Sequence, residues 1–376
     1  MLFYAQAMSG ERTEGGRFAL SYQSWLAIGL IWLVWGHFTE RVPAPYLGVP
    51  EEPALICNLG KFGIFIGFVV FGYLFTQARE RSKDLAELYS DGLARIWPLL
   101  VAASLLIYVI VQFFPAPVVP SGPKEFNTEP VHLGDLLGSL LFLEDLGFAW
   151  VDGAFWPLLT VVKFWVLAGL LAFLAPRRHV QILTIAAIVV SLAAMILEFV
   201  PMPGSGLLRK ALNGLLIASY LPYFVAGVLI GHRRRTLSLL AITVVVLLHV
   251  ALTISHIYQF DWLATAIVLV LTAALVGVDR VLARGAILGF VARFAFAWFL
   301  VHQIIGLILI KWLAPQIGID PAVAFAFAAT LAIGVGLSLT VEGPGFRLLK
   351  RPLERLFRAV GLARLRLAEA PRTAAA

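Results

Sequence analysis

The feature that most constrains this chain is a series of apolar segments, each long enough to cross a lipid bilayer. A membrane-spanning helix needs about 20 apolar residues to cross a hydrocarbon core of about 30 Å. A short apolar run at 136–150 also carries Glu144 and Asp145, so we expect it to be interfacial or re-entrant. The remaining segments predict an all-α polytopic membrane protein with ten transmembrane helices, at 22–39, 57–77, 93–114, 154–175, 180–200, 212–231, 236–255, 262–279, 286–311 and 321–341.

The composition excludes a water-soluble protein. Hydrophobic residues make up 60% of the chain and charged residues 14%, and the mean hydropathy is +0.90. Soluble domains are about 45–50% apolar and about 25% charged. A chain this apolar cannot cover its surface with polar groups. The first twenty residues contain several charges and no long apolar run, so we expect no cleavable signal peptide.

The distribution of positive charge predicts the topology. The chain has 29 Lys and Arg against 22 Asp and Glu, and most of the basic residues lie in alternate loops and in the tail. Positive loops stay on the cytoplasmic side. We therefore expect both termini to be cytoplasmic and the protein to lie in the inner (plasma) membrane. The domains would be a cytoplasmic segment at 1–21, a ten-helix domain at 22–341 and a basic amphipathic tail at 342–376, which would lie on the anionic leaflet.

Four ionisable residues at or near membrane depth are candidate functional groups, because such residues are costly there. His37 ends the first span near the outer face, where an interfacial histidine is an equally good interpretation. His302 lies in the outer half of the ninth span among apolar residues, which favours a polar cavity. Lys163 either snorkels outward from the fourth span or lines a water-filled cavity. Arg95 begins the third span and is at least a positive-inside anchor.

Several other kinds of site find no support in the sequence. The single cysteine, Cys57, excludes an intramolecular disulfide and a cysteine metal cluster. The histidines lie on different spans with no acid at ligand spacing, so we expect no metal site. No internal repeat is found, which gives no support to an inverted-repeat transporter.

Six short motifs follow one another between residues 22 and 350. In this order they resemble the acyltransferase-3 family of membrane O-acyltransferases. Two positions depart from the family pattern at charged residues: Leu26 replaces an arginine eleven residues before the first histidine, and Val161 replaces a glutamate in the fourth span. Phe71 replaces a serine. The motifs are the first span ending in His37, GKFGIFIGFVVFGYLF, RIWPL at 95–99, VDGAFWPLLTVVKFW, FAWFLVHQ with His302, and VEGP at 341–344.

The resemblance implies transfer of an acyl group, acetyl or succinyl, from cytoplasmic acyl-CoA to a hydroxyl of a cell-envelope glycan or lipid. His37 would be the base or the acyl carrier and His302 its partner, since histidine suits both roles near neutral pH. Lys163 would replace the missing cationic group. Arg95 would meet the phosphates of the CoA donor. The expected partners are the bilayer, acyl-CoA and the acceptor, without metal or nucleic acid.

Two other functions stay open at this point. A transporter or flippase on the same scaffold would use the histidines for gating or proton coupling and would not consume acyl-CoA. A catalytically inactive membrane partner is consistent with Leu26 and Val161. Consumption of acyl-CoA separates the transferase from both. Accumulation of a substrate in vesicles separates the transporter from the inactive partner.

Overall fold

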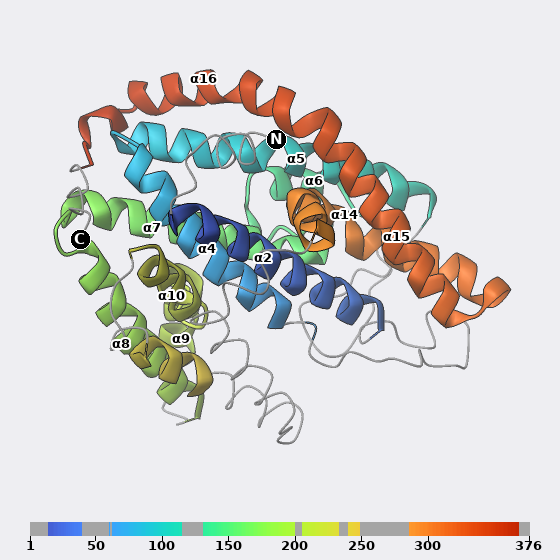
Figure 1. Cartoon of the computed structure of the whole chain (residues 1–376), viewed down its shortest axis with the longest axis horizontal. Helices are drawn as coiled ribbons and strands as arrows, with labels where there is room; N and C mark the ends of the chain where they lie inside the picture. The colour runs from blue at the N-terminus through green and yellow to red at the C-terminus, as the bar shows by residue number, and fades with distance from the viewer. Residues whose placement is uncertain are drawn as a thin grey trace. The chain divides into compact units, whose positions relative to one another are not determined.

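The computed structural model describes residues 14–39, 60, 62–114, 131–199, 205–232, 240–248 and 286–367 (Figure 1). Within these residues the regular structure is helical, apart from an isolated antiparallel bridge between Asp84 and Arg366. The all-α prediction is confirmed. The longer helices are α2 (Glu14–Thr39), α4 (Phe62–Arg81), α5 (Leu85–Phe113), α6 (Leu133–Leu140), α7 (Trp156–Leu174), α8 (His179–Phe199), α9 (Ser205–Leu215), α10 (Leu221–Gly231), α14 (Ala286–Ile317), α15 (Ile319–Leu337) and α16 (Gly343–Ala359).

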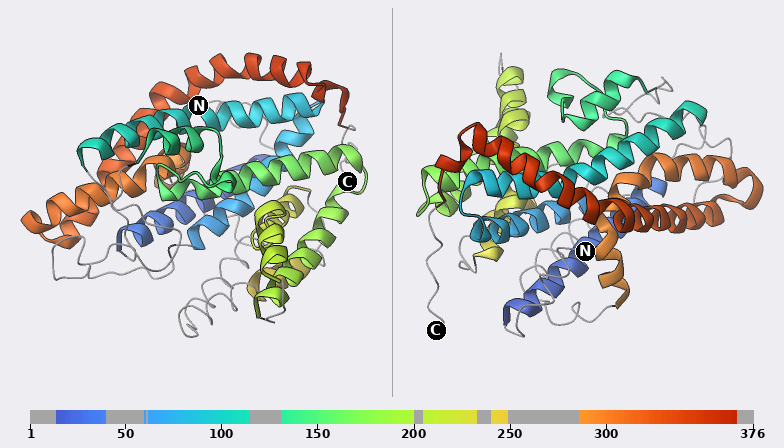
Figure 2. Two further views of the ribbon diagram at one scale, coloured as in Figure 1. Left: turned by 180° about the vertical axis from the view of Figure 1, so that it is seen from behind. Right: turned by 90° about the horizontal axis from the view of Figure 1, so that it is seen from above.

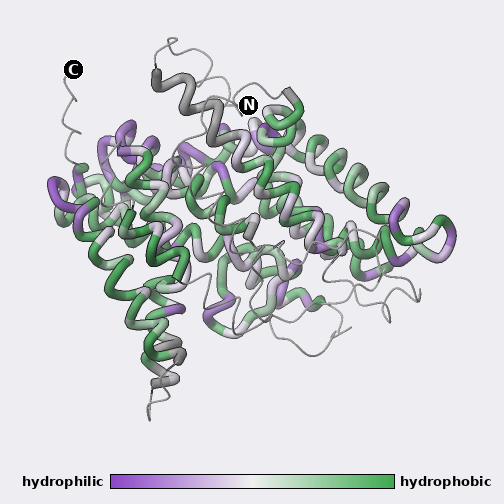
Figure 3. Tube along the Cα trace, turned by 60° about the horizontal axis from the view of Figure 1, so that its bottom comes forward, coloured by the Kyte–Doolittle hydropathy of each residue, from purple (hydrophilic) through white to green (hydrophobic). Residues whose placement is uncertain are grey.

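Five helices in the described part of the chain are long and apolar enough to cross a membrane. Figure 3 shows that hydrophobic residues make up much of the helical part of the chain. These helices confirm a polytopic membrane protein. Of the predicted spans, 262–279 lies outside the described residues and 236–255 is described only at 240–248, so the count of ten stays a prediction. The five helices are Leu85–Phe113, Gly153–Leu174, His179–Leu197, Ile287–Ile317 and Ile319–Ala359.

The chain divides into two compact units, each made of three stretches of sequence. The first unit contains Met1–Gly67, Arg95–Leu159 and Asp279–Arg347. The second contains Phe68–Ala94, Thr160–Val278 and Leu348–Ala376. His37, Arg95 and His302 therefore belong to the first unit, and Lys163 to the second.

The centre of the first unit is α14, which packs against α15 and α2 (Figures 1 and 2). The turn from α14 to α15 is at Gly318, whose φ of 86° is a left-handed conformation that favours glycine. Trp298 is fully buried, and its indole N–H donates to the Thr330 hydroxyl at 3.0 Å. A Cβ on Gly334 would lie 2.7 Å from the Cα of Trp298, so the small residue permits this close approach.

Glycines also allow α2 to pack closely against the start of α4 in the first unit. A Cβ on Gly63 would lie only 2.1 Å from the carbonyl oxygen of Gly29. A Cβ on Gly60 would lie 2.6 Å from the Cα of Gly36. These contacts hold the end of α2, which carries His37, close to the residues at the start of α4.

The segment at 136–150 does not cross a membrane. Its helix α6 has eight residues, which extend about 12 Å at 1.5 Å per residue. A 3-10 turn at Glu144–Leu146 follows, and another at Gly153–Phe155 (η2) precedes α7. The indole N–H of Trp97 donates to the carbonyl of Leu140 at 2.9 Å, which fixes α6 against α5.

In the second unit, α10 packs against α8 and against the later part of α4. The rings of Phe164 and Phe224 stack with centroids 4.4 Å apart. A Cβ on Gly72 would lie 1.9 Å from the carbonyl oxygen of Phe224. The backbones of α4 and α10 thus meet directly, as small residues allow in membrane helix pairs.

The predicted sixth span, 212–231, is wrong as one continuous helix. The chain is helical as α9 up to Leu215 and again as α10 from Leu221. Between them Ile217 has a φ of 47°, and the N–H of Ala218 donates to the carbonyl of Leu212 at 3.1 Å. A hydrogen bond that runs back from Ala218 to Leu212, across the left-handed residue Ile217, is typical of the C-terminal end of a helix.

Proline explains why the helix does not continue. Pro222 is the second residue of α10. It has no N–H to donate, and in a continuous helix its ring would clash with the carbonyl of Ala218, four residues earlier. That carbonyl instead accepts a hydrogen bond from the Ser191 hydroxyl of α8 at 2.5 Å. Hydropathy alone does not reveal this break.

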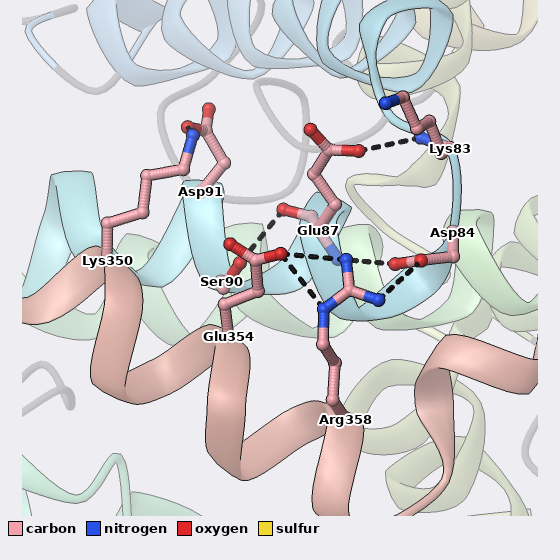
Figure 4. A network of polar contacts seen from close by, with 8 residues as sticks. All are labelled: Lys83, Asp84, Glu87, Ser90, Asp91, Lys350, Glu354 and Arg358. Atoms are coloured by element: carbon pink, nitrogen blue, oxygen red, sulfur yellow. Dashed lines mark hydrogen bonds and ion pairs between the residues drawn. The ribbon is translucent and has the colours of Figure 1, made fainter.

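The helix α16 covers the first half of the predicted basic tail. It follows α15 through a π-helical turn at Ser338–Glu342. In the second unit Lys350 forms an ion pair with Asp91 at 3.0 Å, and Arg358 forms one with Asp84 at 3.2 Å (Figure 4). Leu353 is buried between these pairs, whereas Arg351 and Leu356 are exposed. Part of the positive charge of the tail is therefore paired within the protein.

Candidate active site

The structure brings His37 and His302 together, although 265 positions separate them in sequence. His37 lies in the last turn of α2 and His302 near the middle of α14. The Nδ1 of His37 is 2.8 Å from the Nε2 of His302. The two rings are nearly parallel, with centroids 5.0 Å apart and planes inclined by 14°. Both side chains are buried, with exposed fractions of 7% and 0%.

A backbone carbonyl determines where the protons of this pair lie. The Nδ1 of His302 is 2.7 Å from the carbonyl oxygen of Phe299. A carbonyl oxygen only accepts hydrogen bonds, so this Nδ1 carries hydrogen. In the neutral pair the Nε2 of His302 is then the acceptor, and the Nδ1–H of His37 donates to it. This tautomer leaves the Nε2 of His37 as a basic nitrogen.

Packing around the pair limits the positions that the rings adopt. Phe38 is fully buried next to His37, and its ring centroid is 6.3 Å from that of His302. A Cβ on Gly306 would lie 2.2 Å from the ring of Phe38. Glycine at 306 therefore makes room for Phe38, one turn beyond His302 on α14.

Asp152 is a buried acid that the sequence analysis did not select. It lies at the start of η2 and is 1% exposed. Its Oδ1 accepts the N–H of Ala154 at 2.8 Å, and its Oδ2 accepts the N–H of Ile304 at 3.2 Å. Burial raises the pKa of Asp152 to about 6, although these two hydrogen bonds lower it. The carboxyl therefore joins the turn before α7 to α14, two residues beyond His302.

Gln303 is a second buried polar residue without an assigned role from the sequence. It is 1% exposed, and neither its Nε2 nor its Oε1 has a hydrogen-bond partner within the described residues. Both Asp152 and Gln303 occur in the motifs quoted above. In the sequence Asp152 is an acid immediately before a predicted span, and a residue in that position is usually a helix cap. The missing partner of Gln303 is visible only in three dimensions.

Lys163 belongs to the second unit, whereas the two histidines belong to the first. Its Nζ donates to the carbonyl of Gly214 at 2.8 Å. Gly214 is in the last turn of α9, where the carbonyls have no partner within the helix. A positive charge there also interacts favourably with the helix dipole. This contact gives Lys163 a structural role, and its role as a replacement cation stays a prediction.

Arg95 begins the motif at 95–99, which packs against the residues just after the motif at 341–344. Its guanidinium is 4.9 Å from the centroid of the Phe346 ring, within the range of a cation–π contact. A Cβ on Gly345 would lie 2.4 Å from the Cβ of Pro98. The run at 95–99 thus packs directly against the residues that follow VEGP. The contact of Arg95 with the phosphates of the donor stays a prediction.

Leu26 and Val161, the two apolar residues at positions where the resemblance implies charged ones, are both at least partly buried. Leu26 is half-buried in α2, and Val161 is 1% exposed in α7. Neither side chain offers a charge or a hydrogen bond. Within the described residues no group of three or more His, Cys, Asp or Glu side chains is placed to hold a metal ion.

Comparison with known protein families finds a match that covers most of the chain. The family model described as an acyltransferase domain, that of the acyltransferase-3 family, matches residues 27–341. No curated protein and no solved structure matches the chain. The matched residues include His37, Asp152, His302 and Gln303.

Proposed function

The chain belongs to the acyltransferase-3 family and is a membrane acyltransferase, and from this premise we propose its donor and acceptor. The donor is a cytoplasmic acyl-CoA that carries an acetyl or a succinyl group. The acceptor is a hydroxyl of a cell-envelope glycan or lipid. The membrane is the inner (plasma) membrane. The observation on which the proposal rests is the buried hydrogen bond between His37 and His302.

The proposed reaction begins with the Nε2 of His37 as general base. The acceptor oxygen attacks the thioester carbonyl carbon while His37 takes the hydroxyl proton. A C–O bond forms and the carbonyl oxygen becomes negative in the tetrahedral intermediate. When the carbonyl re-forms, the C–S bond breaks. The proton on His37 then passes to the thiolate, and CoA leaves as the thiol.

His302 acts on His37 and not directly on the substrate. Once His37 is positively charged, its Nδ1–H donates more strongly to the Nε2 of His302. The Phe299 carbonyl supports this arrangement because it keeps hydrogen on the other nitrogen of His302. If His37 is instead the acyl carrier, the same Nε2 is the nucleophile. A labelled acyl group found on His37 in acid-quenched enzyme would identify His37 as the acyl carrier, and its absence would favour the general base.

The proposed topology has ten spans, the sixth of them broken between α9 and α10, with both termini cytoplasmic. The domains are a cytoplasmic segment at 1–21, the ten-helix domain at 22–341 and the basic tail at 342–376. The alternation of basic loops supports this topology. It puts His37 at the outer end of its span and Arg95 at the inner end of another. Arg95 would then contact the phosphates of CoA while the acyl group reaches the histidines.

The experiment uses membranes that contain the full chain, with labelled acetyl-CoA or succinyl-CoA on the cytoplasmic side. We expect label on an outer-face glycan or lipid, and loss of that label in His37→Ala and His302→Ala. His179→Ala is a matched control, because His179 is also buried and also bonds a backbone carbonyl through Nδ1. No transfer from either donor by folded wild type would contradict the proposed donors.

Lys163 is tested in the same assay. We propose that its ammonium supplies the cationic group that Leu26 lacks, so Lys163→Met should lower transfer. The capping contact with Gly214 predicts some loss of stability as well. If the variant is less stable but transfers at the wild-type rate, Lys163 only caps α9 and takes no part in the transfer.

A further inference from the structure

Gln303 presents an unpaired carboxamide in the most buried part of α14. The residues from Trp298 to Ile308 are buried, and Gln303 is 1% exposed. Neither polar atom of its side chain has a hydrogen-bond partner within the described residues. A buried polar group without a partner costs about 1–3 kcal/mol. Such groups in native proteins call for an explanation, for example a bound ligand or a functional role.

The position of Gln303 connects it to the histidine pair. It is the residue directly after His302, about 3.8 Å away between Cα atoms and about 100° around the helix axis. The residue before it bonds His37, and the residue after it bonds Asp152 through the Ile304 N–H. Both neighbours are thus tied to other elements of the first unit. The backbone that carries Gln303 is held from two sides, as a preorganised binding group requires.

The chemistry of acyl transfer supplies the missing partner. The carbonyl oxygen of the thioester becomes negative as the hydroxyl attacks, and a fixed N–H donor stabilises that charge. The resemblance stated above implies an arginine and a glutamate at the positions of Leu26 and Val161, and neither residue present in this chain donates a side-chain hydrogen bond. Gln303 has two N–H groups and no charge, so it meets the requirement at a low desolvation cost.

We propose that the side-chain N–H of Gln303 donates a hydrogen bond to the carbonyl oxygen of the acyl group that is transferred. This assignment rests on the proposed function, since it concerns the thioester donor. The bond is strongest in the tetrahedral intermediate, when the oxygen is negative, and it weakens again when the C–S bond breaks. The amide neither gains nor loses a proton in the step. His37 alone exchanges the proton of the hydroxyl.

The test is Gln303→Met in the full-length protein, because methionine has nearly the same length and volume and no N–H. Loss of one such donor lowers kcat by about 10²–10³-fold in other acyl-transfer enzymes. We expect a loss of this size, with the KM for acyl-CoA within about threefold of wild type. We also expect an equal or higher Tm in the absence of substrate, since an unpaired buried amide has been removed.

A matched control is available on the same helix. Gln316 is exposed, and its Nε2 donates to the backbone carbonyl of Trp312 at 2.8 Å. Gln316→Met should transfer at the wild-type rate. Near-wild-type kcat in Gln303→Met would overturn the assignment, and so would a lower Tm, which would mean that the amide has a structural partner. If wild type itself transfers nothing, the proposed function fails, and the assignment fails with it.

Discussion

The carboxylate of Asp152 accepts a hydrogen bond from the backbone N–H of Ile304 at 3.2 Å. A side chain from the turn before α7 therefore reaches the backbone of α14, two residues beyond His302. The contact is fully buried, and burial raises the pKa of Asp152 to about 6. This buried acid therefore connects the turn before α7 to the part of α14 that carries His302, and we expect it to make the stability of the protein depend on pH.

The first prediction concerns that pH dependence. Unfolding exposes Asp152 and returns its pKa to about 4. Between about pH 4 and 6 the folded state keeps a proton that the unfolded state has released, so the free energy of unfolding falls as pH rises through this window. Two pKa units correspond to about 3 kcal/mol. Asparagine does not ionise, so Asp152→Asn should lose this contribution to the change of Tm between pH 4 and 7.

The control for this experiment is Asp135→Asn. Asp135 is partly exposed and also accepts two backbone N–H groups, those of His132 and Ala149. Asp135→Asn also removes a carboxylate that accepts backbone N–H groups, so it controls for the loss of such hydrogen bonds outside the core. If Asp152→Asn keeps the wild-type dependence of Tm on pH, burial of the Asp152 carboxyl does not control the pH response.

The second prediction concerns the histidines as one unit. Because His302 acts through its hydrogen bond to His37, the single variants His37→Ala and His302→Ala should each lower transfer by about 10²–10⁴-fold. The double variant should be no slower than His37→Ala alone, since residues that act together are not additive. Initial rates of label transfer measure this. A double variant whose loss equals the product of the two single losses would mean that the histidines act independently.

Two glycines of α4 provide a matched pair for the third prediction. A Cβ on Gly63 would lie 2.1 Å from the carbonyl oxygen of Gly29, whereas a Cβ on Gly67 would find its nearest neighbour 3.9 Å away. Gly63→Ala should therefore separate α2 from α4 and lower the Tm clearly. Gly67→Ala should be neutral, or more stable by up to about 1 kcal/mol, because alanine favours helix. Equal Tm values for the two variants would contradict the close packing.

The fourth prediction concerns the attachment of α16 to α5. The Nζ of Lys350 is 3.0 Å from the Oδ1 of Asp91, and Lys350→Glu replaces this attraction by repulsion between two carboxylates, so it should destabilise the contact. The double variant Lys350→Glu with Asp91→Lys should recover most of the loss. An ion pair of this partial exposure contributes about 0.2–1 kcal/mol and weakens in salt. Protection of the tail from protease at low and high salt measures it, and failure of the double variant to recover would exclude the pair.

Hydropathy predicted the elements whose signal is a continuous apolar run. The predicted spans 93–114, 154–175, 180–200 and 286–311 correspond to α5, α7, α8 and α14 within a few residues at most ends. The run at 212–231 is also apolar enough to be predicted as a span, yet it is broken. The break depends on Pro222 and on the hydrogen bond from Ser191 to Ala218. A hydropathy averaged over the segment is not sensitive to either.

The site was predicted only as separate residues. His37 and His302 were selected because each is a polar residue in an apolar span, but their hydrogen bond depends on how α2 packs against α14. Asp152 was overlooked because an acid before a helix is usually a cap, and it is one here as well. Its second bond, to Ile304, comes from the tertiary fold. No local pattern distinguishes Gln303 from a glutamine that has a partner.

The break between α9 and α10 has a consequence for how the protein is made. The eleven residues of α10 extend about 16 Å, roughly half of a hydrocarbon core. This piece is too short to enter a bilayer as an independent helix. The break before it leaves the carbonyl of Ala218 without a helical partner, and the Ser191 hydroxyl of α8 donates a hydrogen bond to this carbonyl. Because α8 precedes α10 in the chain, we expect α10 to insert only once α8 is in the membrane, so that the order of the chain sets the order of insertion.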